Sequence, residues 1–176
     1  AARIEGERLV VSGLSDLASP IGLVARIQRV ALDGRVLAEE TVEAELPPDR
    51  AVEMGTFPAE AGDEHFYVLD ARRRGELAYD PNLRLVVLPD KPKRFDLPLA
   101  TLAIEAFPKR PGTFALSSDR PAFYVKPEAA GFNGAFDDAS FLLLPGEKRT
   151  VTFRSYDGRI PGLDDVSVLH LADTYR

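Results

Sequence analysis

The feature that most constrains the fold of this chain is a repeated alternation of apolar and polar side chains. In segment 41–46, Val42, Ala44 and Leu46 alternate with polar residues, which is typical of a strand with one buried face. No segment of ten or more residues shows the apolar spacing of a helix. The pattern therefore predicts an all-β chain. The predicted strands cover 8–12, 23–28, 41–46, 66–69, 83–88, 102–107, 114–117, 123–125, 141–144, 151–154 and 166–171.

A proline-rich and charged stretch at 89–98 interrupts this alternation. Its three prolines have no N–H to donate, so it cannot pair as a central strand. We interpret it as a linker between two tandem antiparallel β-sandwiches, residues 1–97 and 98–176. Each is close to the roughly 100 residues of an immunoglobulin-like domain. Because the chain has neither Cys nor Trp, the likeness to antibody domains is one of architecture only.

Charge and composition exclude several classes of protein. The 22 basic and 28 acidic residues give a net charge of −6, and the one basic triplet, Arg72 to Arg74, is expected in a solvated loop. We therefore expect no nucleic-acid partner. No apolar run is long enough for a transmembrane helix, so no membrane span is expected. The chain begins without Met or a leader, as an excised or processed segment would, and the compartment (cytoplasm or periplasm) stays open.

Catalytic signals are weak. The chain has no thiol, no GxSxG turn and no glycine-rich phosphate loop. Neither of its two histidines, His65 and His170, is interpreted as catalytic, and His170 is expected to be a packed or hydrogen-bonded strand residue. Paired loop carboxylates could hold calcium, but turn capping is the preferred interpretation. We expect no catalytic residue and no cofactor. The weak calcium candidates are Asp137, Asp138, Asp164 and Asp165, with Asp157 nearby in the sequence.

Carbohydrate binding remains an open alternative. Sugar faces stack on exposed rings, and without Trp only tyrosines could provide such a platform. Aromatic residues in strands more often serve packing. The available tyrosines are Tyr67, Tyr79, Tyr124, Tyr156 and Tyr175.

One segment of the second half is more specific than these patterns. It reads SSDRPAFYV at 117–125, GAFDDASFLLLPGE at 134–147 and TVTF at 150–153. It resembles the C-terminal immunoglobulin-like domain of family 2 glycoside hydrolases, in particular the β-mannosidase branch. The first half resembles the preceding sandwich of the same enzymes, through Leu14 to Leu17, Asp33-Gly34 and the closing residues 92–98.

The resemblance implies structural roles for several residues. Phe136 and Phe141 flank an acidic turn and are expected to plug one end of the sandwich, while Asp138 is expected to accept backbone N–H groups. Pro145, Gly146 and Glu147 predict a tight turn. The family has Asn where this chain has Ala139, so any hydrogen bond of that Asn must be absent or replaced.

The resemblance implies no catalysis by this chain. In the family, both catalytic glutamates belong to a TIM barrel, and the acid/base residue follows an Asn. Here Asn82 and Asn133 are followed by Leu83 and Gly134. We therefore expect a non-catalytic piece that packs against the barrel of a β-mannosidase-like parent enzyme. The alternatives are a carbohydrate-binding module and a protein-interaction or adhesion sandwich.

Overall fold

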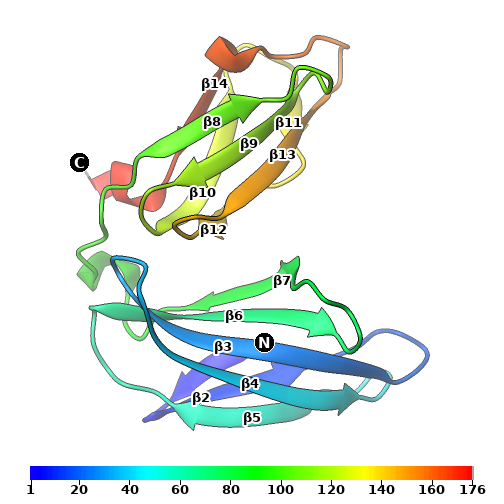
Figure 1. The fold of residues 1–176 in the computed structure, drawn as a ribbon, viewed down its shortest axis with the longest axis vertical. Helices are drawn as coiled ribbons and strands as arrows, with labels where there is room; N and C mark the ends of the chain where they lie inside the picture. Colours follow the sequence, from blue (N-terminus) through cyan, green and yellow to red (C-terminus); the bar gives the residue numbers. More distant parts are fainter. Residues whose placement is uncertain (176) are drawn as a thin grey trace. The chain divides into compact units, whose positions relative to one another are not determined.

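The computed structural model describes residues 1–175, which are built mainly from β-strands (Figure 1). The chain divides into two compact units, the first covering Ala1–Asp96 and the second beginning at Leu97. This division falls within the stretch that the sequence marks as a linker. The all-β class and the antiparallel pairing expected from the alternation are confirmed.

Two facing sheets form the first unit (Figure 1). The smaller sheet has the order β1-β2-β5 and the larger one the order β4-β3-β6-β7. Their strands are β1 (Ala2–Glu5), β2 (Arg8–Gly13), β3 (Ile21–Ala31), β4 (Val36–Leu46), β5 (Val52–Pro58), β6 (His65–Arg73) and β7 (Asp80–Val87).

The core of this unit lies between the sheets. Leu9 and Val11 from β2 pack with Ala25 and Ile27 from β3 and with Leu69 from β6. All five are at most 4% exposed. Their spacing of two residues along each strand sends them to one face, as the alternation predicts.

The outer face of strand β3 is buried as well, which the sequence pattern does not predict. Val24 is 2% exposed and Gln28 is 7% exposed, although both alternate with the core residues. Next to them on β6, Asp70 is 2% exposed and is hydrogen-bonded to Arg26 and Arg84. A central strand flanked by such long side chains loses contact with water on both faces.

The second unit is also a two-sheet sandwich, with strand orders β12-β10-β14 and β11-β13-β9-β8. Phe114 and Leu116 pack against Val125, Leu143 and Val151 in its core. Its strands are β8 (Leu102–Ala106), β9 (Thr113–Ser118), β10 (Ala122–Ala129), β11 (Gly134–Phe136), β12 (Phe141–Leu143), β13 (Lys148–Ser155) and β14 (Val166–Leu169).

Some local expectations are wrong. Strands β1, β5 and β11 are not predicted by the alternation. Arg72 and Arg73 end strand β6 instead of lying in a loop. Residues 1–175 also contain three short 3₁₀ helices: η1 (Pro92–Arg94) within the expected linker, η2 (Leu163–Asp165), and η3 (Leu171–Tyr175), where the strand was expected to continue to 171.

Candidate functional site

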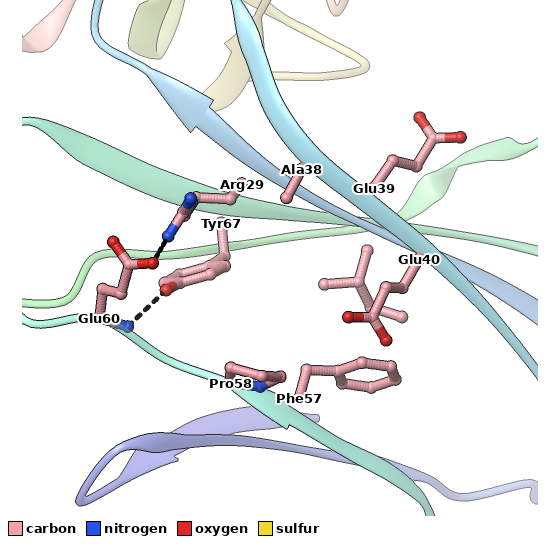
Figure 2. A pocket seen from close by; sticks show the side chains of 9 residues that line it. Arg29, Ala38, Glu39, Glu40, Phe57, Pro58, Glu60 and Tyr67 are labelled. Carbon is pink, nitrogen blue, oxygen red and sulfur yellow. Dashed lines mark hydrogen bonds and ion pairs between the residues drawn. The ribbon is translucent and has the colours of Figure 1, made fainter.

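A small pocket opens on the first unit between strands β4 and β5 (Figure 2). Its volume is about 180 Å³. Ile27 contributes to its apolar lining, and the side chains of Glu40 and Phe57 approach each other across it (Figure 2). The full lining is Ile27, Arg29, Ala38, Glu39, Glu40, Phe57, Pro58, Glu60 and Tyr67.

Strand register places a carboxylate along this pocket, where Glu40 stays exposed to solvent. On β4, Glu40 pairs with Ile27 and shares the inward-facing side of Val42. Glu39 alternates with it, points away from the pocket (Figure 2), and accepts a 2.6 Å hydrogen bond from the Gln28 amide. Glu40 thus occupies a position where the alternation predicts an apolar side chain. Within residues 1–175 its carboxylate has no ion-pair or hydrogen-bond partner.

The opposite wall is held by an ion pair and a backbone hydrogen bond. Arg29 is ion-paired with Glu60 (Figure 2). The Glu60 backbone N–H donates to the Tyr67 hydroxyl oxygen over 2.9 Å. Burial raises the pKa of Tyr67, and the positive charge of Arg29 opposes that shift in part. Tyr67 therefore keeps its hydroxyl proton at neutral pH and can donate it.

Phe57 owes its position to a glycine two residues earlier on β5. A side-chain carbon added at Gly55 would lie 3.2 Å from the Phe57 ring. Without that carbon, the ring is free to lie along the strand, partly buried against the core and partly lining the pocket. Small residues at such positions allow this close approach.

A second hollow of about 650 Å³ shares Arg29 and Glu60 with the first. His65 lies in its wall, 7% exposed, and its Nε2 atom has no hydrogen-bond partner within the described chain. Burial lowers the pKa of His65, Arg29 lowers it further, and Glu64 opposes them. The ring contacts Tyr67 edge-on at 5.5 Å. His65 is therefore a neutral, packed ring.

The acidic turn of the second unit lies far from this pocket in the chain and has different partners from those expected. Asp138 is ion-paired with Arg149 instead of accepting backbone N–H groups. Its neighbour Asp137 accepts the Thr152 N–H at 2.8 Å. Phe136 and Phe141 both pack against the core.

The predicted turn at 145–147 is present in the second unit. The Glu147 N–H donates to the Leu144 carbonyl over 3.1 Å, and Gly146 has a φ of 80°, which suits glycine. The Glu147 carboxylate accepts the Leu144 N–H at 3.2 Å. These contacts give Glu147 a structural role in closing the turn.

The remaining carboxylate candidates serve local turns. Asp165 accepts the Gly162 N–H at 2.8 Å, and Asp157 accepts the Arg159 N–H at 3.0 Å, which lowers the pKa of Asp157. Asp164 lies beside Asp165 in η2. No three His, Asp or Glu residues among the described 1–175 are grouped so that they could hold a metal ion.

The tyrosines occupy different environments. Tyr67 is buried in the pocket wall, and Tyr79 lies under the Arg26 guanidinium at 4.5 Å. The exposed tyrosines are Tyr124 at 51%, Tyr156 at 72% and Tyr175 at 53%. The pocket itself was not predicted from the sequence. The signal that could have located it is the pair of charged residues, Arg29 and Glu40, at inward-facing strand positions.

The sandwich architecture of the second unit defines it as an immunoglobulin-like domain. Residues 102–174 match the family described as Ig_mannosidase, an Ig-fold domain. The sequence resemblance to the C-terminal immunoglobulin-like domains of family 2 glycoside hydrolases is therefore confirmed. No curated protein matches the chain.

Solved structures extend the likeness of fold to nearly the whole chain. A β-D-mannosidase from Dictyoglomus thermophilum matches 97% of it with a TM-score of 0.73 and 16% identity. The exo-chitosanase CsxA from Amycolatopsis orientalis matches 93% with a TM-score of 0.55 and 18% identity. The matched regions are only 21% and 25% of those two chains. No helix among residues 1–175 has the length and apolar character needed to span a bilayer.

Proposed function

We propose that this chain is the non-catalytic, two-sandwich accessory part of a β-mannosidase-like glycoside hydrolase, and that it supports the enzyme's catalytic barrel. The observation that carries the proposal is the coverage: the mannosidase match spans 97% of this chain and 21% of the longer one. A segment that corresponds to a fifth of an enzyme has the size of an accessory region. The parent would cleave terminal β-mannosidic or related bonds with retention of configuration.

The lack of catalysis by the chain itself follows from the chemistry of retaining glycosidases. They use two carboxyl groups roughly 5 Å apart, one as the nucleophile and one as the acid/base. The resemblance places both on a TIM barrel, and the acid/base glutamate after an Asn. Asn82 and Asn133 precede Leu83 and Gly134, so no such pair can be assigned to this sequence.

Hydrolysis of a chromogenic aryl β-mannoside tests the absence of catalysis. We expect the purified chain to release no nitrophenol above the buffer rate, with an active β-mannosidase as the positive control. Turnover by the chain that is lost on mutation of one of its own residues would contradict the proposal.

Sequencing the gene upstream of the Ala1 codon tests the accessory role. We expect an open reading frame of several hundred codons, with alternating strands and helices and an Asn-Glu pair. A start codon or secretion leader directly before Ala1 would instead favour a free-standing sugar-binding or adhesion protein.

A further inference from the structure

We propose that the pocket between strands β4 and β5 binds a single sugar ring, with Glu40 and Phe57 as its main contacts. The site lies wholly within the first unit, outside the segment that matches the immunoglobulin-fold family. The proposal therefore does not depend on the existence of a parent enzyme.

Size limits the ligand. The volume of about 180 Å³ is below the roughly 300–1,000 Å³ typical of pockets for drug-sized ligands. An extended oligosaccharide cannot be enclosed in such a space, whereas one ring or the end of a chain can enter. Ile27, which lines the pocket, and the Phe57 ring present apolar surface, which suits the C–H face of a pyranose.

The polar groups of the lining suit hydroxyl groups. A hydroxyl both donates and accepts hydrogen bonds. The Glu40 carboxylate accepts only, while the Tyr67 hydroxyl and the Arg29 guanidinium supply donors. Arg29 Nε is buried and has no partner among the described residues. The pocket thus offers both hydrogen-bond donors and hydrogen-bond acceptors around its apolar lining.

The alternative ligand, a cation drawn by Glu40, is less favoured. Glu60 is already neutralised by Arg29, and Glu39 points away toward Gln28. One carboxylate therefore remains, and the Arg29 guanidinium stands on the opposite wall (Figure 2). The positive charge of Arg29 repels a cation that enters the pocket, but it does not repel a neutral polyol.

Titration of the ¹⁵N-labelled chain, followed by NMR, tests the site. The probes are D-mannose, D-glucose and n-butylammonium. We expect at least one neutral hexose to saturate with a Kd of about 1–10 mM, and shifted amides to cluster at the residues that line the pocket. Glu40→Gln should weaken binding about tenfold, because it removes a charged acceptor, and Phe57→Ala should weaken it as well.

The matched control is Glu43→Gln on the same strand. Glu43 lies on the opposite face and is exposed, so this variant should bind like the unmodified chain. Circular dichroism and thermal melting verify that each variant folds. A flat titration with both hexoses up to about 100 mM, tighter binding of butylammonium than of the hexoses, or unchanged binding by Glu40→Gln would each overturn the proposal.

Discussion

Arg84 donates a 2.6 Å hydrogen bond from Nε to the Asp70 carboxylate, on the face of β6 that points away from the core. The other carboxylate oxygen accepts from Arg26 at 2.7 Å, and Asp70 is 2% exposed. One buried negative charge thus binds two cations from strands on either side of β6. The pairing explains how a sheet face without an apolar pattern is closed to water.

Removal of that carboxylate should destabilise the first unit. Asp70→Ala leaves two guanidinium groups, partly desolvated, without their counter-charge, and we expect a loss of about 3 kcal/mol in the free energy of unfolding. Urea denaturation measures it. The control is Glu5→Ala, which breaks an exposed pair with Arg3 and should cost less than about 1 kcal/mol. Equal effects of the two variants would show that the Asp70 network is no stronger than a surface pair.

The same network should make stability depend on pH in the acid range. Burial raises the pKa of Asp70, but hydrogen bonds from Arg84 and Arg26 outweigh it and hold the pKa below the usual 3.8. As the pH falls, the unfolded chain therefore protonates the Asp70 carboxyl at a higher pH than the folded chain does. The contribution of Asp70 to stability is complete above pH 3.8 and is lost as the pH falls through the lower pKa of the folded state. Asp70→Asn should flatten the stability profile between about pH 5 and 2. A profile parallel to that of the unmodified chain would contradict the assignment.

His65 should produce a second dependence at higher pH. Burial and the Arg29 charge lower its pKa below the ordinary 6.5. Below pH 6.5, His65 is protonated in the unfolded chain but stays neutral in the folded chain until the pH reaches its lower pKa there. Stability should therefore decline as the pH falls from 6.5 toward the folded-state pKa. His65→Leu should remove this slope, measured by urea denaturation at about pH 7.5, 6.5 and 5.5. An unchanged slope would assign the titration to another group.

The sequence predicted most of the larger strands because their alternation is regular. The inward side of β4 at Val42, Ala44 and Leu46 is an example. It did not predict β11, whose three residues are too few to show a period, nor the burial of Asp70, which depends on two arginines from other strands. The pocket was missed for a similar reason. In the sequence Glu40 is one of several consecutive polar residues and gives no signal of its own. Only the strand register shows that it lies on the inward-facing side of β4.

Strand β11 depends on Gly134 for a reason that is visible only in three dimensions. A side-chain carbon there would lie 2.4 Å from the Arg154 carbonyl oxygen and 2.5 Å from the Phe153 ring. Gly134→Ala should therefore force β11 away from β13 and cost about 1–3 kcal/mol. Gly162→Ala is the matched control, because its nearest neighbour would be a side-chain oxygen at 3.5 Å. Equal unfolding midpoints for the two variants would contradict the close approach.

Tyr124 has a backbone conformation that L-residues rarely adopt. Its φ is 53°, at an irregularity where β10 pairs with β12 between Ala122 and Val125, and its side chain is 51% exposed. Glycine has no Cβ to clash in this region, so Tyr124→Gly should be more stable than Tyr124→Ala by about 1 kcal/mol. Urea denaturation of the two variants measures the difference.

An exposed tyrosine without that conformation provides the comparison. Tyr156 is 72% exposed and has no positive φ, so the order should reverse there. Tyr156→Ala should be the more stable variant by about 0.4–1 kcal/mol, because glycine adds freedom to the unfolded chain. Alanine more stable than glycine at both positions would show that Tyr124 does not hold the left-handed conformation in solution. Glycine more stable than alanine at position 124, with alanine more stable than glycine at position 156, would attribute the difference to the bulge in β10.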